Sequence, residues 1–157
     1  MNNRIIIGSD HAAFDAKNQL KKYLEKKGYE VEDAGTYTPE SCDYPLIAHA
    51  LCQRIRSGEF ERGILLCGTG IGMSIAANKH DGIRAALCHN ELTARLTREH
   101  NNANVLCVGA RVVGLELIYA IADIFLCTDA LSTERHIRRQ GQLEALEKGT
   151  GKNSENN

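Results

Sequence analysis

A cysteine followed by a glycine-rich segment has the residue types of an anion site with a thiol at its edge. Cys67 precedes Gly68-Thr69-Gly70-Ile71-Gly72, and three glycines in five residues let backbone N–H groups turn toward one ligand. A helix starting near Met73 would add positive potential, which lowers the pKa of a nearby thiol toward neutrality. This combination predicts a thiol that transfers a proton while the loop holds the negative charge left behind. On spacing alone, a thiol packed in the core at a strand end is an equally good interpretation.

The residue at position 73 excludes three better-known kinds of glycine loop. A dinucleotide-binding G-x-G-x-x-G needs glycine where Met73 stands, and a P-loop needs Gly-Lys-Ser/Thr where the chain has Gly72-Met73-Ser74. A C-x5-R phosphatase needs arginine at the same position, because its phosphoryl transition state requires a cationic clamp. The loop therefore fits none of these classes.

Basic residues near the C-terminal end suggest a phosphate ligand. Arg135 and Arg139 are one helical turn apart, so both project from one face. Two guanidinium groups suit a dianionic phosphate, because each guanidinium can bind it through a pair of hydrogen bonds. A run of this kind, which here includes Arg138, is more usually a solvated basic face.

Two of the six histidines lie at the ends of expected elements. His11 follows the first expected strand directly after Asp10, and His100 ends an expected helix. A lone histidine is most often a satisfied surface or core residue, so these positions favour a site only modestly. Asp10 is placed to orient an imidazole or to accept a proton itself.

The elements that must position these residues alternate between strands and helices. Apolar runs and helical spacing predict strands at 4–8, 29–33, 63–66, 84–88 and 105–108, with helices at 13–27, 44–57, 73–78, 92–99, 115–126 and 133–147. This alternation predicts a single-domain, three-layer α/β/α sandwich around a five-stranded parallel, Rossmann-like sheet, with the less apolar strand 29–33 nearer an edge. Ligands of such sheets bind outside the carboxyl ends of the strands, where Asp10, Cys67 and Arg111 are expected. His100 differs, because it precedes the fifth strand.

Composition indicates an ordinary soluble domain. The chain has 157 residues, of which 43% are apolar and 25% charged, and a net charge of -1, which gives no general attraction for nucleic acid or an anionic membrane. No stretch has the length of a signal-peptide core or a membrane span, so a cytoplasmic protein is expected. Residues 1–148 are expected to form the domain, and the polar segment 149–157 to be disordered.

The six cysteines do not have the spacing of a disulfide framework or a metal site. They stand at 42, 52, 67, 88, 107 and 127 without a C-x-x-C pair, so we expect reduced thiols and no metal. Cys52, Cys107 and Cys127 fall in apolar segments, where a thiol packs as a small hydrophobe. The apolar segment 115–126 predicts a helix that is buried or forms an interface.

Several blocks of residues 4–147 together resemble the ribose-5-phosphate isomerase B family, which also includes the galactose-6-phosphate isomerase subunits. The blocks are Gly8-Ser9-Asp10-His11-Ala12, Asp43-Tyr44-Pro45, the segment from Cys67 to Lys79, Gly82-Ile83-Arg84-Ala85, His100-Asn101-Asn102-Ala103-Asn104 and Gly109-Ala110-Arg111. Together they are far more specific than the glycine loop alone.

The resemblance implies a reversible isomerisation of ribose 5-phosphate and ribulose 5-phosphate through an enediolate, without metal or cofactor. It makes Cys67 the proton-transferring base, and Thr69 an aid to proton exchange between the two substrate oxygens. The N–H groups from Gly68 to Gly72 become oxyanion donors, where losing one donor typically costs about 10²–10³ in rate. His100, helped by Asp10, becomes the group that opens the furanose ring.

The resemblance also implies ligands for the rest of the substrate and a shared site. The phosphate ligands would be His11, Arg111, Arg135 and Arg139, and the sugar hydroxyls would be held by Asn101 and Tyr44. The family is dimeric with each site built from two chains, and a tetramer also stays open. One branch replaces the cysteine by a glutamate later in the loop. Here Ile71 and Ser74 supply no carboxylate, so the thiol branch applies.

Two other functions stay open on the sequence. The same chemistry would serve a 6-phosphohexose such as allose or galactose 6-phosphate. A non-catalytic module that binds a phosphosugar or nucleotide ranks last, because a pure binder does not need a thiol beside an oxyanion loop.

Overall fold

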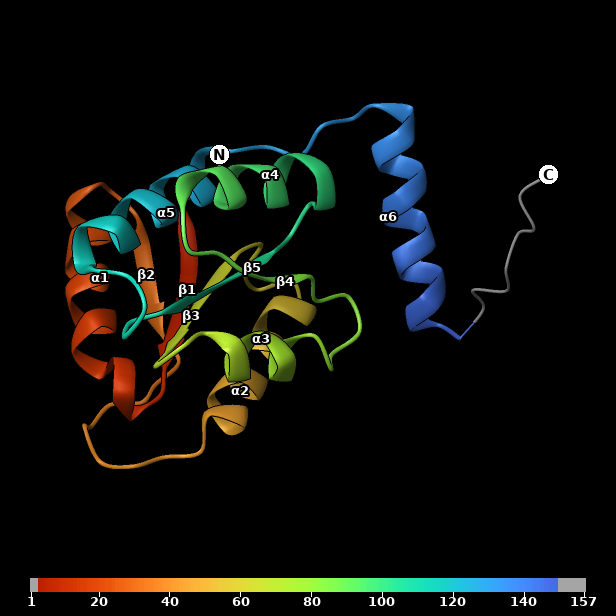
Figure 1. Cartoon of the computed structure of the whole chain (residues 1–157). Coiled ribbons are helices and arrows are strands. Elements are labelled where there is room, and N and C mark those ends of the chain that lie inside the picture. Colours follow the sequence, from red (N-terminus) through yellow and green to blue (C-terminus); the bar gives the residue numbers. More distant parts are fainter. Residues whose placement is uncertain (1–2, 150–157) are drawn as a thin grey trace.

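A computed structural model describes residues 3–149 as strands and helices that alternate around one sheet (Figure 1). The strands are β1 (Arg4–Ser9), β2 (Glu30–Asp33), β3 (Gly63–Cys67), β4 (Ala85–Leu87) and β5 (Val105–Gly109). The helices are the short 3₁₀ helix η1 (His11–Ala13) and α1 (Phe14–Lys26), α2 (Tyr44–Arg56), α3 (Ile71–Ala77), α4 (Glu91–Asn101), α5 (Leu115–Cys127) and α6 (Glu134–Glu147).

The sheet has the architecture that the sequence predicts. Its five strands are parallel and lie in the order β2-β1-β3-β5-β4. The prediction of a Rossmann-like α/β sandwich is confirmed, and β2 lies at an edge, as its weaker apolar character indicates. Because β2 and β3 flank β1 on opposite sides, the strand order reverses at β1. In parallel sheets this point, outside the carboxyl ends of the strands, is where ligands bind.

Side chains that alternate along the strands divide the core between the two faces of the sheet. Ile5 and Ile7 pack with residues of α1, α4 and α5, whereas Ile6 and Leu65 pack with residues of α2 and α3. Helix α5 buries Phe125 and its apolar neighbours in the first of these clusters. The apolar helix predicted at 115–126 is therefore packed on one face within the chain.

Helix α6 stands away from the sheet, beyond the C-terminal end of α4, which it contacts (Figure 1). Three of its large apolar side chains, Ile137, Leu143 and Leu146, are exposed. This helix therefore presents apolar surface that the described part of the chain leaves uncovered.

The element boundaries differ from the predictions in small ways. Helix α3 begins at Ile71 rather than at Met73, because Gly70 adopts the left-handed conformation that precedes it. Strand β4 is shorter than predicted. Apart from Gly149, the tail predicted to be disordered lies outside the described residues. Among the helices of residues 3–149, none combines the length and apolar character needed to cross a bilayer.

Candidate active site

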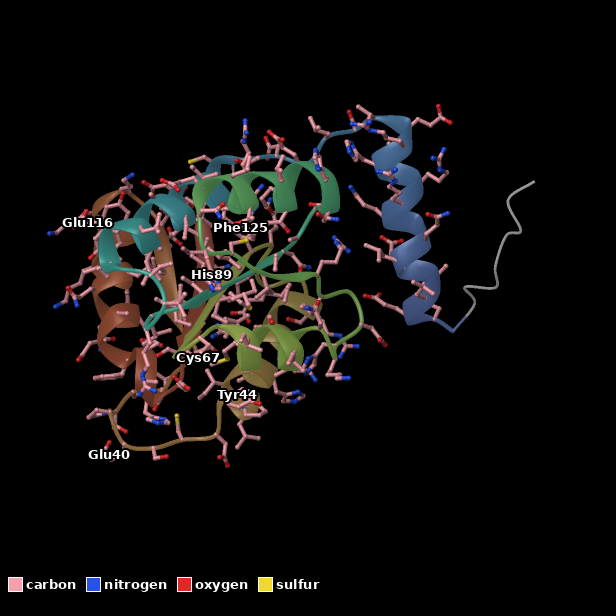
Figure 2. All side chains as sticks on the ribbon, viewed as in Figure 1. Glu40, Tyr44, Cys67, His89, Glu116 and Phe125 are labelled. Carbon is pink, nitrogen blue, oxygen red and sulfur yellow. The ribbon has the colours of Figure 1, made fainter. Side chains whose placement is uncertain are left out.

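The glycine loop holds the sulfur of Cys67 at the end of β3. Strand β3 is buried along its whole length, and Cys67 is 5% exposed. The N–H of Gly70 donates a hydrogen bond to Cys67 Sγ over 3.0 Å. Figure 2 shows Cys67 at the carboxyl edge of the sheet, on the side that α3 covers and toward Tyr44 at the start of α2. The thiol thus lies under the loop that the sequence singles out.

Close approach explains two of the glycines at this edge. A Cβ atom on Gly70, whose φ is +77°, would lie 2.4 Å from Leu87 Cδ1 and 2.9 Å from the carbonyl carbon of Val108. A Cβ atom on Gly109 would lie 2.5 Å from the carbonyl carbon of Thr69. The loop therefore rests directly on the ends of β4 and β5, which leaves it little freedom to move.

The backbone N–H groups of the loop divide into two sets. The N–H of Gly70 is bonded to the thiol, and the N–H of Ile71 donates to Thr69 Oγ1 over 3.3 Å. Those of Gly68, Thr69 and Gly72 donate to no acceptor among residues 3–149. Gly68 and Gly72 are half-buried and Thr69 is exposed, so these three N–H groups are available to a ligand oxygen, which would satisfy them.

Asp10 and His11 occupy the carboxyl end of β1 and are held by local hydrogen bonds. Asp10 is 8% exposed, and its Oδ1 accepts from the N–H of Ala12 over 3.0 Å, which caps η1. The N–H of Cys42 donates to His11 Nδ1 over 3.3 Å. Because Nδ1 accepts, neutral His11 carries its proton on Nε2 and can donate it to an anion.

Arg111 and Tyr44 form the borders of the loop. The N–H of Arg111 donates to the carbonyl of Gly68 over 2.9 Å. Its side chain runs beside that glycine, where a Cβ atom would lie 3.4 Å from Arg111 Cδ and 3.7 Å from Ala12 Cβ. On the other side, the Tyr44 ring covers Gly72, whose Cβ would come within 2.8 Å of Tyr44 Cζ. The structure thus brings together Asp10, His11, Tyr44, Arg111 and the segment from Cys67 to Gly72.

Within one chain, the remaining predicted site residues lie at the other end of the strands, where the strands begin. His100 and Asn101 end α4 just before β5, whose first residue pairs with Gly63 at the far end of β3 from Cys67. The four residue steps of β3 amount to about 13 Å at roughly 3.3 Å per residue. Asp10 and His100 of a single chain are therefore too far apart for Asp10 to assist His100 in ring opening, the role that the resemblance implies.

His100 contacts α6 instead. Its ring stacks on that of His136, with centroids 4.6 Å apart and planes 13° apart, and its carbonyl accepts from Gln140. Burial lowers the pKa of His136, and the neighbouring Arg135, His100 and Arg139 lower it further. Arg135 and Arg139, two of the three arginines predicted to bind phosphate, are exposed on this same helix. These side chains form a second, separate group of predicted site residues.

The other cysteines have surroundings unlike that of Cys67. All six thiols are free, and burial raises the pKa of Cys52 to about 12 and that of Cys107 well above its usual value. Cys127 is exposed, with Sγ 3.8 Å from the Tyr29 hydroxyl. The prediction that Cys127 packs in the core is wrong, because it is the last residue of α5, where the apolar face has ended.

Two contributors to these groups are not among the residues that the sequence predicts for the site. Cys42 acts through its backbone N–H, which carries no signal in the residue type. His136 does have a signal in the sequence, because it is adjacent to Arg135, a candidate phosphate ligand.

Most of the chain has clear relatives. The model of the Ribose/Galactose Isomerase family matches residues 5–143. Ribose-5-phosphate isomerase B of Escherichia coli is 44% identical over 92% of this chain and 96% of its own length. Galactose-6-phosphate isomerase subunit LacB of Clostridium acetobutylicum is 47% identical over 78% of this chain and 70% of its own. A crystal structure of a ribose 5-phosphate isomerase from Thermotoga maritima superposes with a TM-score of 0.87, at 54% identity over 90% of this chain and 97% of that one. The chain therefore belongs to the ribose/galactose isomerase family.

Proposed function

We propose that this chain, a member of a sugar phosphate isomerase family, interconverts ribose 5-phosphate and ribulose 5-phosphate with Cys67 as the base. The observation that carries the proposal is the position of Cys67 Sγ. It lies beneath a loop that offers unpaired N–H groups, and Arg111 borders that loop. A base and oxyanion donors serve an enediolate mechanism, and a phosphate ligand suits a phosphorylated sugar as substrate.

The proposed reaction moves one proton between two carbons. The Cys67 thiolate removes the proton from C2 of the open-chain aldose, and the electrons of that bond form the C1–C2 double bond of an enediolate. The π electrons of the C1 carbonyl move to O1, where the free N–H groups of Gly68, Thr69 and Gly72 stabilise the charge. The Thr69 hydroxyl then passes the proton of O2 to O1. The electrons on O2 then form the C2 carbonyl while the C1–C2 π electrons take the proton of the Cys67 thiol at C1, which gives the ketose and regenerates the thiolate.

Local hydrogen bonds favour these roles. The Gly70 N–H on the sulfur makes a stronger, charge-assisted bond to a thiolate than to a thiol. Thr69 Oγ1 accepts from Ile71, so its own O–H is free to donate to substrate. His11 Nε2–H and the Arg111 guanidinium lie at the same edge and suit the phosphate.

The side chain that opens the sugar ring and the remaining side chains that bind the phosphate would come from a second copy of the chain. Within one chain, His100, Asn101, Arg135 and Arg139 are separated from Cys67 by the length of the sheet. Helix α6 projects beyond the sheet with exposed apolar side chains, as expected of an arm that packs on a neighbour (Figure 1). We therefore propose a homodimer with shared sites, and a tetramer would be a pair of such dimers.

A 6-phosphohexose is the second candidate substrate. The 47% identical relative is a galactose-6-phosphate isomerase subunit, and the reacting carbons of the two sugars are alike. Comparing kcat/KM for ribose 5-phosphate with that for allose and galactose 6-phosphates separates the two. Phosphorylated sugars are made and used inside cells, so either substrate favours the cytoplasm.

An assay of ribose 5-phosphate conversion tests the proposal. We expect turnover at an unchanged rate with and without a chelator, because the proposed mechanism uses only protein groups: the thiol, the amides, the Thr69 hydroxyl and His100. Tight nucleotide binding with no conversion of any of these sugars would instead favour a non-catalytic binding module.

A further inference from the structure

A cavity rich in hydrogen-bond donors lies at the amino-terminal end of the parallel strands, opposite the end that carries Cys67. Its volume is about 360 Å³, and Arg62, Arg84 and Asn104, which line it, immediately precede β3, β4 and β5. These three strands are neighbours, and the carbonyls of Asn104 and Arg84 bond the first residues of β3 and β5. Arg98 and Asn102 of the α4 end complete the polar lining with Glu61. The strand length of β3 separates this cavity from Cys67.

Two of the three arginines, Arg84 and Arg98, use only part of their hydrogen-bonding capacity. Arg98 donates to the carbonyls of Thr128 and Ala103 and to Asn102 Oδ1. Arg84 donates from Nε to the Asn102 carbonyl over 3.0 Å. Both terminal nitrogens of Arg84, and Nη2 of Arg98, donate to no acceptor within residues 3–149. Guanidinium N–H groups that line a cavity without an acceptor are available to a ligand.

Two of the cavity's arginines, Arg84 and Arg98, form no ion pair with a carboxylate among residues 3–149, whereas Arg62 pairs with Asp129. Arg98 is only 5% exposed, and its pKa is lowered to about 10 by burial, by Arg62 and by Arg84, while Asp129 opposes this. The Asp129 carboxylate that pairs with Arg62 belongs to a side chain that is 74% exposed, and Glu61 is exposed as well. A buried cation without a close carboxylate is costly, and an anion in the cavity would offset that cost.

We propose that this cavity binds a tetrahedral dianion, either inorganic phosphate or the phosphate group of a small monoester. Arg84 would hold it with paired N–H groups from its two terminal nitrogens, the geometry that guanidinium offers to phosphate oxygens, and Arg98 would add the N–H groups of Nη2. Asn102, which Arg84 and Arg98 both bond, caps the end of α4, so the bound anion also fixes the segment that carries His100 and Asn101.

Isothermal titration with inorganic phosphate tests the proposal on the unaltered protein and three variants. We expect two binding events per chain, one of which Arg111→Gln removes and the other of which Arg84→Gln weakens at least tenfold. Arg95→Gln, an exposed arginine on the helix of Arg98, is the matched control and should keep both. Glycerol 3-phosphate in place of phosphate distinguishes the sources, because tighter binding at the Arg84-dependent event indicates a monoester and equal binding indicates the free ion. A single event that only Arg111→Gln removes overturns the proposal.

Crystals of the unaltered protein soaked in selenate give a test that does not depend on a folded variant. An anomalous peak within hydrogen-bond distance of Arg84 and Arg98 supports the site, and a cavity without one while selenate occupies the Arg111 site contradicts it. Neither result depends on isomerase activity, so the proposed function stands or fails separately.

Discussion

The backbone of Thr69 lies so close to Gly109 that a Cβ atom on the glycine would sit 2.5 Å from the Thr69 carbonyl carbon and oxygen. Real Cβ atoms do not approach a backbone this closely, so a side chain at Gly109 must displace the loop. The end of β5 is thus the support on which the loop over Cys67 rests.

Gly109→Ala should therefore lower kcat at least tenfold, because it displaces the loop amides from the positions that hold the oxyanion. Steady-state kinetics on ribose 5-phosphate measure this. Gly141→Ala is the control, since a Cβ there meets nothing within 4 Å and alanine favours its helix, α6. Equal activity of the two variants would show that loop position does not matter.

Lys17→Met should destabilise the protein by about 3–5 kcal/mol, as expected when one partner of a buried ion pair is removed. The Lys17 side chain is fully buried, and its Nζ donates to both Asp33 carboxylate oxygens over 2.7 Å and to the Thr36 carbonyl over 2.6 Å. Urea unfolding gives the free energy of unfolding. Lys22→Met, at an exposed position of the same helix, should change it by less than about 0.5 kcal/mol.

Mixed dimers should regain activity from two inactive variants if sites are shared between chains. Cys67→Ala and His100→Asn would each be inactive alone. In a heterodimer one site carries both changes and the other carries neither, so purified heterodimers should have about half of the unaltered activity. Differently tagged chains, co-expressed and purified through both tags, allow the measurement. A heterodimer as inactive as its parents would mean that Cys67 and His100 act within one chain.

His136 predicts a pH dependence of stability. Burial and its cationic neighbours lower its pKa in the folded state, so below the ordinary value of 6.5 the unfolded chain binds more protons. The free energy of unfolding should then fall as the pH drops through 6.5 toward the lowered native pKa. Urea unfolding at pH 7.5 and 5.5 should show a smaller loss for His136→Gln than for the unaltered protein. An equal loss would assign the effect to other groups.

The sequence was sufficient for the sheet and for the loop, because both depend on local signals. Apolar runs such as Ile5 to Ile7 give a strand buried on both faces, and glycines around Thr69 give a turn whatever packs on it. The helical spacing also predicts His100 at a helix end before β5. Contacts between segments that are distant in the sequence have no local pattern of residues that would predict them. The Tyr44 ring on Gly72 and the Cys42 amide on His11 depend on how the long loop before α2 crosses the sheet edge.

The measurement that tests the central claim most directly compares Cys67→Ala with Cys127→Ser in turnover and in binding of ribose 5-phosphate. We expect Cys67→Ala to lose about 10²–10⁴ in kcat, the usual contribution of a positioned base, while its Kd for the sugar phosphate stays within about threefold. Cys127→Ser should match the unaltered protein, because that thiol is exposed at the end of α5. A Cys67→Ala variant that keeps more than about a tenth of the normal kcat would contradict the role of Cys67 as the base.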